Sequence, residues 1–300
     1  MKKPLGTVTR GTTNPNRLRR VDNFIAYRCG DLLRAAAEPL VVDLGYGATP
    51  VTPVELRARL AAAVRADVTV VGLEIDPVRV DKAQESADPP CLEFRRGGFE
   101  LAGLRPVVVR AFNVLRQYAE DEVAAAWQTM TATGAFLVEG TCDELGRIAT
   151  WACVAGDGPL TLTLSARLSD LDHPATFAER LPKALIHHNV PGEPIHEILH
   201  RLGAAWDASA TPFGPRQRWL NMIGRLRAEG MPILDGPARW RRGELTIPWP
   251  CPGRQDVAYS AITVRSASIS ASEVNGFLTS SASSSMRPLV TAMSLGSPEM

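Results

Sequence analysis

The sequence predicts an α/β fold with a doubly wound, mostly parallel sheet, and three observations lead to that prediction. Short apolar segments alternate with helical segments along residues 38–139. Most of the apolar segments are continuous runs of Val and Leu, a pattern that is typical of strands buried on both faces. An Asp-x-Gly-x-Gly turn ends the first of these runs at residues 43–47. Because strand and helix alternate, we expect right-handed crossovers into a parallel sheet.

The strands and helices of this sheet can be placed by their patterns. We expect strands at residues 40–44, 67–74, 92–95, 107–111 and 135–139, with helices between them at 53–64, 77–86 and 121–131. Residues 1–37 form a polar lead followed by a helix, because apolar residues recur there at spacings of three and four. The runs at 148–154 and 160–166 flank a Gly-Asp-Gly-Pro turn, which predicts an antiparallel hairpin that closes the sheet.

The rest of the chain differs in character from this core at 38–166. We expect residues 167–250 to form a helical cap, or substrate region, with helices at 176–185, 194–208 and 215–229. Residues 251–300 hold twelve serines and little periodicity. We therefore expect a Ser-rich tail that is mostly disordered from residue 257 onward.

Charge and cysteine usage set broad limits on partners and compartment. The 300 residues carry a formal net charge of +1, which gives no global argument for nucleic acid or an anionic membrane. The first 34 residues hold eight basic and two acidic ones, which fits either a patch for an anionic partner or a solvated face. Five cysteines without a Cys-x-x-Cys pair favour a reducing compartment. With no secretory signal and no apolar run of membrane-spanning length, we expect a cytoplasmic protein.

The first strand ends in a glycine-rich turn that suits a nucleotide cofactor. Asp43, Gly45 and Gly47 occupy the places where glycine lets the backbone turn tightly and approach a ligand. A dinucleotide site would normally have a third glycine, but Thr49 stands nearby instead. The second strand ends at Glu74, a carboxylate able to accept two hydroxyl hydrogen bonds from a ribose diol.

Residues 40–140 resemble the core of the class I S-adenosylmethionine-dependent methyltransferases. The matching motifs are residues 41–47, 72–76, 94–100 and 109–118. The resemblance covers about half of the chain and implies a seven-stranded Rossmann-like sheet with S-adenosyl-L-methionine as cofactor. It assigns cofactor contacts, by position, to the following residues: Asp43, Gly45, Gly47, Glu74, Asp76, Phe99 and Glu100.

The resemblance implies methyl transfer, but it does not identify the acceptor. Asn113, Arg116 and Tyr118 lie where the family places residues that face the acceptor, and they are the candidates for catalysis. The family's Asp/Asn-Pro-Pro-Tyr motif is absent after the fourth strand, which speaks against methylation of base or glutamine amino groups. A small molecule, a lipid, a protein or an RNA all remain open as acceptors. The sequence does not indicate an oligomeric state.

Two other functions remain open from the sequence. The chain would be a non-catalytic adenosyl- or nucleotide-binding protein if no residue activates an acceptor. A zinc metallopeptidase is suggested by His196, Glu197 and His200, which match His-Glu-x-x-His. Trp206 stands where the longer zinc motif has its third histidine, so we expect no metal. Arginine and tryptophan at 216–219 and 239–242 suit either RNA stacking or helix packing.

Overall fold

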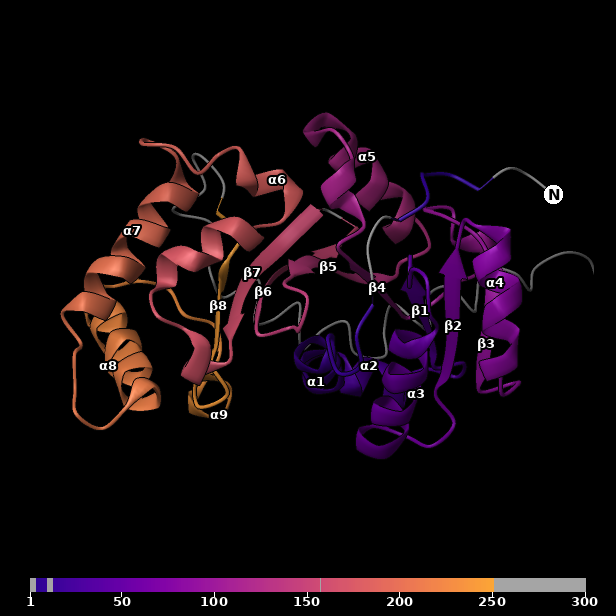
Figure 1. Cartoon of the computed structure of the whole chain (residues 1–300), viewed down its shortest axis with the longest axis horizontal. Coiled ribbons are helices and arrows are strands. Elements are labelled where there is room, and N and C mark those ends of the chain that lie inside the picture. The colour runs from indigo at the N-terminus through magenta and orange to yellow at the C-terminus, as the bar shows by residue number, and fades with distance from the viewer. Residues whose placement is uncertain (1–3, 10–12, 157, 251–300) are drawn as a thin grey trace, which may run out of the picture. The chain divides into compact units, whose positions relative to one another are not determined.

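A single sheet organises the computed structural model, which describes residues 4–9, 13–156 and 158–250 (Figure 1). Its eight strands follow the order β3-β2-β1-β4-β5-β6-β7-β8. The strands are β1 Leu40–Leu44, β2 Thr69–Glu74, β3 Leu92–Arg96, β4 Val108–Phe112, β5 Phe136–Cys142, β6 Ile148–Ala155, β7 Gly158–Ala166 and β8 Glu244–Pro248. Pairing is parallel from β3 through β5 and antiparallel from β5 through β8.

Helices precede the sheet, connect its parallel strands and cover its antiparallel part. They are α1 Arg19–Arg28, α2 Gly30–Ala35, α3 Val51–Ala63, α4 Pro77–Ala83, α5 Glu120–Thr131, α6 Lys183–Ile186, α7 Pro194–Asp207, α8 Pro215–Ala228 and α9 Pro237–Trp240. Short 3-10 helices lie at Gln84–Ser86, Leu101–Gly103, Leu115–Gln117, Leu168–Asp170 and Pro174–Arg180. Several helices begin with proline at a first-turn position, where the missing N–H costs no hydrogen bond.

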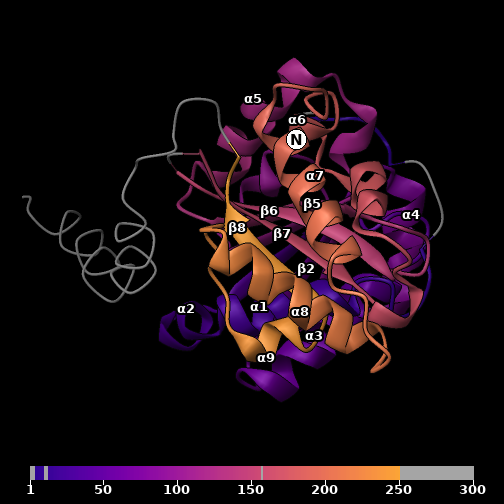
Figure 2. The ribbon, with the colours of Figure 1, turned by 90° about the vertical axis from the view of Figure 1, so that its left-hand side faces the viewer.

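Both faces of the sheet are covered, as its apolar strands require. On one face, α1, α2 and α3 pack over β1, β2 and β4, with Trp151 of β6 fully buried among them. On the other face, α5 covers the parallel strands. There, α7 and α8 cover β7 and β8 (Figure 2). Trp206 and Trp219 belong to the core between these helices and strands. The strand ends that bear the glycine turn therefore lie at an edge between two helical layers.

The observed elements confirm the predicted α/β class and add a strand. Strands β1 to β5 each begin and end within a few residues of the expected ranges, and β6 and β7 form the predicted antiparallel hairpin. The sheet has eight strands where seven were expected, because β8 pairs with β7. Successive side chains of this strand alternate between the two faces of the sheet. Leu245 and Ile247 enter the core with α7 and α8, and Thr246 between them forms a hydrogen bond with Thr163. Part of the expected cap thus belongs to the sheet.

The arginine and tryptophan segments of the cap are engaged in packing. Trp219 is fully buried, and the guanidinium of Arg218 lies 4.3 Å from the ring centroid of Trp206. Arg239 is buried and pairs with Glu244. Burial leaves the ring of Trp219 unavailable as a stacking platform for RNA, and Trp240 is partly buried with the guanidinium of Arg227 5.2 Å from its ring centroid.

Two further expectations concern the tail and the membrane. The Ser-rich tail at 251–300 lies outside the described residues. Among the residues that are described, no helix combines the length and the apolar character needed to cross a bilayer.

Candidate functional site

The candidate site lies at the carboxyl ends of β1, β2, β3 and β4. In a doubly wound sheet, ligands bind outside the carboxyl ends where the strand order reverses. Here the order reverses between β1 and β4, which are direct neighbours. A cavity opens at that point and is lined by Gly45, Gly47, Phe112 and Asn113, among other residues.

The turn after β1 depends on its two glycines. Gly45 and Gly47 have φ angles of 70° and 84°, which side chains with a Cβ rarely adopt. A Cβ at residue 45 would lie 2.8 Å from a methyl carbon of Val114 and 2.9 Å from a methyl carbon of Thr9. The turn therefore brings its backbone close to whatever lies over it, as a site for a nucleotide-type ligand requires.

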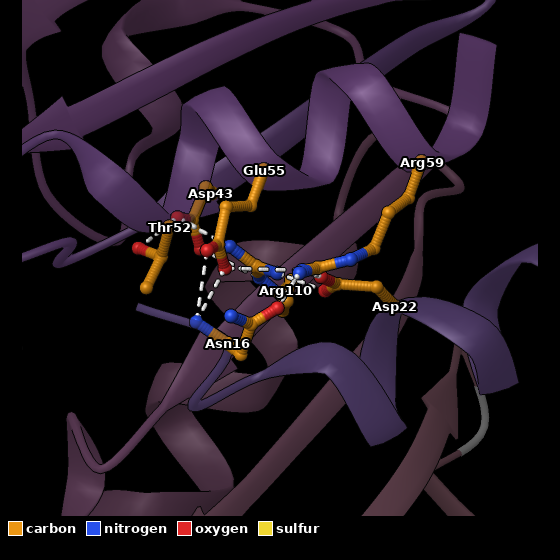
Figure 3. Close-up of polar contacts among 7 residues, drawn as sticks. All are labelled: Asn16, Asp22, Asp43, Thr52, Glu55, Arg59 and Arg110. Carbon is orange, nitrogen blue, oxygen red and sulfur yellow. Dashed lines mark hydrogen bonds and ion pairs between the residues drawn. The ribbon is translucent and has the colours of Figure 1, made fainter. Parts of the chain in front are cut away.

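Asp43 lies beneath this turn in a buried ion-pair cluster (Figure 3). Arg110 of β4 binds it through two hydrogen bonds, from Nε to Oδ1 at 2.9 Å and from Nη2 to Oδ2 at 2.6 Å. The hydroxyl of Thr52 donates to Oδ2 at 2.9 Å. Both carboxylate oxygens of Asp43 thus accept hydrogen bonds from Arg110 and Thr52, and these bonds hold the start of the glycine turn in place.

The same cluster ties the N-terminal helix to the sheet. Arg110 also pairs with Asp22 of α1, and Arg59 of α3 pairs with Asp22 as well. Burial alone disfavours the charged form of Arg110, but the carboxylates of Asp43 and Asp22 raise the pKa of its guanidinium above the ordinary value. Paired burial of this kind is tolerated only when every charge keeps its partner, so the cluster fixes α1, β1 and β4 together.

Glu74 ends β2 with its carboxylate turned toward the glycine turn. One oxygen accepts from the Ile75 N–H at 2.8 Å. The other accepts from the Gly47 N–H at 3.1 Å and from the Thr9 hydroxyl at 2.9 Å. Glu74 is only 1% exposed, and the Thr9 hydroxyl is among the groups that cover its carboxylate.

The turn after β3 offers a donor and an acceptor side by side. The Phe99 N–H donates to the Leu5 carbonyl oxygen at 3.0 Å. The Glu100 carboxylate accepts from the Leu5 N–H at 2.7 Å and from the Gly98 N–H at 2.9 Å. An amide donor beside a carboxylate acceptor complements adenine, whose amino group is flanked by acceptor nitrogens.

Asp76 lies next to the site but has a different contact. Its carboxylate accepts from the Val78 N–H at 2.9 Å and caps α4. It also lies 3.7 Å from Arg79. Its observed role is therefore to start the helix after β2.

The three candidates for catalysis lie in different surroundings. Asn113 lines the cavity with φ at 58°, and its side chain bonds to Cys142. Tyr118 accepts a hydrogen bond at its hydroxyl from the Thr7 N–H at 2.6 Å. Arg116 instead donates to the Glu179 carbonyl oxygen at 3.0 Å. The structure thus brings Asn113 to the cavity beside the glycine turn, whereas Tyr118 lines a second cavity together with Thr7 and Phe99.

Sequence reasoning missed the residues that the N-terminal lead contributes. Thr9, Thr13 and Arg17 line the cavity beside the glycine turn. The Thr13 hydroxyl donates to the Tyr46 carbonyl oxygen at 3.0 Å. The excess of basic residues before position 34 was the one available signal, and it indicates charge without indicating position.

The His-Glu-x-x-His motif lies on α7, far along the chain from the glycine turn. His196 contacts Asn189 through Nδ1 at 3.3 Å, and Glu197 and His200 are exposed. Within the described ranges, no three His, Cys, Asp or Glu side chains are grouped to hold a metal ion. Among the described residues, therefore, no third ligand accompanies His196 and His200.

Comparisons with known proteins find similarity only among solved structures. No family model and no curated protein matches the chain. Magnesium protoporphyrin IX methyltransferase from Synechocystis PCC 6803, with bound SAH, is 20% identical over 44% of this chain and 62% of its own, with a TM-score of 0.34. Its structure with bound SAM is 20% identical over 45% and 66%, with a TM-score of 0.33.

Human N-acetylserotonin methyltransferase in complex with SAM is 19% identical over 43% of this chain and 39% of its own, with a TM-score of 0.28. The chain thus spans less than two thirds of the length of each of these proteins. The activities named are those of the other proteins.

Proposed function

We propose that this chain is a methyltransferase that uses S-adenosylmethionine, held at the carboxyl ends of β1, β2 and β3. The main support is the convergence of three features on one edge of the sheet. These are the Gly45 to Gly47 turn, the Glu74 carboxylate, and the Phe99 N–H beside the Glu100 carboxylate. Together they match the chemistry of an amino acid, a ribose diol and an adenine in that order.

The residues fit this cofactor when each is tested by its chemistry. Gly45 and Gly47 would allow the methionine part to approach the backbone, because no Cβ stands in the way. Glu74 already accepts a hydroxyl group, which is what a ribose would offer. Phe99 and Glu100 already hold an amide donor and acceptor, the pair that adenine also presents.

Two of the residues assigned by resemblance would act indirectly. Asp43 would fix the glycine turn through its buried pair with Arg110. Asp76 would fix the start of α4. Neither needs to touch the cofactor to matter for its binding.

The bound cofactor would supply a methyl group on a positively charged sulfur. Its displacement depends on positioning the acceptor and excluding water, and a base is required only if the nucleophile starts protonated. Asn113, which lines the cavity beside Gly47, and Tyr118, which lines the second cavity beneath residues 5–9, would face the acceptor. Arg116, which points to Glu179, would contribute to the fold of this edge. The acceptor class remains open among a small molecule, a lipid, a protein and an RNA.

Calorimetric titration with S-adenosylhomocysteine tests the cofactor, and NAD serves as the contrasting ligand. We expect binding of the adenosyl ligand and none of NAD. Glu74→Gln should weaken binding roughly 10- to 100-fold, because a hydrogen bond to a charged group is worth about 1.5–3 kcal/mol. Glu93→Gln is the matched control, since Glu93 pairs with Arg95 on neighbouring β3. Equal affinity of the two variants for S-adenosylhomocysteine, or no binding of this ligand by the unaltered chain, would refute the proposed site.

The second candidate function is a non-catalytic adenosyl-binding protein. It is favoured by the engagement of Asn113 with Cys142 and of Tyr118 with Thr7, which leaves neither of these two side chains plainly placed as a base. Incubation with methyl-labelled S-adenosylmethionine and separate small-molecule, lipid, protein and RNA fractions distinguishes the two. Label in any one fraction supports transfer, and binding without label in all four supports the alternative.

A further inference from the structure

The N-terminal segment at residues 5–9 crosses the groups that the proposed function assigns to the adenosyl ligand. The peptide of Leu5 places its N–H on Glu100 Oε2, at 2.7 Å, and its carbonyl oxygen on the Phe99 N–H, at 3.0 Å. Adenine would satisfy the same two groups with its amino nitrogen and an adjacent ring nitrogen. The segment thus presents the hydrogen-bonding pattern of the ligand's base.

The far end of the segment meets the group assigned to the ribose. Thr9 is buried, and its hydroxyl donates to Glu74 Oε2 at 2.9 Å. Arg79 donates to the Thr9 carbonyl oxygen at 3.0 Å and lies 3.5 Å from Glu74. A hydroxyl on a carboxylate is the contact that a ribose would make there.

The middle of the segment is bound by Gln117 and Tyr118, which follow strand β4. The Thr7 N–H donates to the Tyr118 hydroxyl at 2.6 Å, and Gln117 donates to the Thr7 hydroxyl at 2.9 Å. Gly6 has a φ of 122°, and a Cβ there would lie 2.8 Å from the Tyr118 hydroxyl. The segment therefore follows a path that a residue other than glycine at position 6 would disturb.

The space left beneath the segment is too small for an adenosyl group. The cavity between the segment and the strand ends has a volume of about 10 Å³, which is room for about one water molecule. A Cβ at Gly98 would lie 1.9 Å from the Leu5 carbonyl oxygen, so the two backbones are in close contact. The segment and an adenosyl ligand would require the same space and the same hydrogen bonds.

We propose that residues 5–9 form an autoinhibitory strap, which occupies the adenosyl site as a stand-in for the ligand and must leave before the cofactor binds. This inference rests on the proposed function. The strap competes within the same molecule, so the apparent affinity for the cofactor equals the intrinsic affinity multiplied by the fraction of molecules in which the strap is released. Any change that weakens the strap raises that affinity while the site itself stays intact.

The test compares the full chain with variants that release the strap, by titration with S-adenosylhomocysteine. Gly6→Ala introduces a Cβ at a positive φ and against Tyr118, and a second variant deletes residues 2–9. Both should bind the ligand on the order of tenfold more tightly than the unaltered chain. Val8→Ala is the matched control, because Val8 belongs to the strap but is 41% exposed, and its affinity should stay within about twofold.

The outcomes separate the strap from the proposed function. Equal affinity in all four proteins would overturn the strap and leave the cofactor site standing. Weaker binding on deletion would also overturn it, because the segment would then be part of the cofactor site. No binding by any protein would overturn the proposed function and the strap with it. Amide hydrogen exchange adds an independent measurement, since saturating ligand should speed exchange at Leu5 and Thr7 while slowing it at Phe99.

Discussion

Glu139 offers a pH test of the buried layer next to the site. It lies in β5 with no exposed surface, and neither carboxyl oxygen has a hydrogen-bond partner among the described residues. Burial raises the pKa of Glu139 from 4.5 to about 8, and the nearby Trp127 opposes this shift only in part. The folded protein therefore keeps a proton on Glu139 that the unfolded chain releases above pH 4.5.

The sign and size of the effect follow from proton linkage. Between pH 4.5 and about 8 the folded state holds one more proton at Glu139, so the free energy of unfolding falls as the pH rises. Each pH unit in this range costs about 1.4 kcal/mol, which amounts to roughly 5 kcal/mol over the whole window. The contribution is intact below pH 4.5 and is fully lost above pH 8.

Glu139→Gln removes this titration while preserving the shape of the side chain. Urea unfolding of both proteins at pH 5, 6, 7 and 8 should show the variant gaining relative stability by about 4 kcal/mol across these pH values. All other titrating groups are shared, so their effects cancel in the difference. Glu85→Gln controls for the loss of a formal charge at an exposed position. A difference between Glu139→Gln and the unaltered chain that stays constant with pH would refute the reasoning.

Three further predictions concern the buried cluster and the cap. Arg110→Met should lower the free energy of unfolding by about 3–5 kcal/mol, because it leaves Asp43 and Asp22 buried without their shared cation. Thr52→Val should cost about 1 kcal/mol, since it removes one hydrogen bond to Asp43; equal stability in urea would contradict the assigned contact. Trp206→Ala should lower the free energy of unfolding by about 3–5 kcal/mol, because Trp206 is buried in the core. Phe213 is 81% exposed, so Phe213→Ala should lower it by less than about 0.5 kcal/mol. If thermal unfolding showed similar shifts in melting temperature for both variants, Trp206 would lie outside the core.

The sequence predicts those parts of the fold and site that depend on local pattern. Strands β1, β2, β4 and β5 are buried along almost their whole length, and burial on both faces favours the apolar runs from which they were predicted. The glycine turn and Glu74 follow from their places at strand ends, because parallel strands end at one edge. β8 was missed since its five residues follow a basic segment and form a strand only through pairing with β7.

Contacts across long stretches of sequence account for what could not be predicted. Thr9 meets Glu74 across 65 residues, and Leu5 meets Glu100 across 95. Arg110 reads as one more residue of a strand, although it pairs with Asp43 and with Asp22, 88 residues away. Periodicity carries no information about such partners, because each depends on how the strand ends and the N-terminal lead come together.

The buried cluster also limits where the strap can move. Asp22 of α1 is held by Arg110, and the Asn16 N–H donates to the Glu55 carboxylate of α3 at 2.8 Å. Thr13 is tied to the glycine turn through the Tyr46 carbonyl oxygen. Thr13 also lines the cavity beside Gly47, so its contact lies where the ligand is proposed to bind. The Asp22 and Asn16 contacts involve none of the groups assigned to the cofactor, so cofactor binding has no reason to break them. Release of the strap should therefore stop before residue 16, and ligand-induced exchange extending into α1 would contradict that limit.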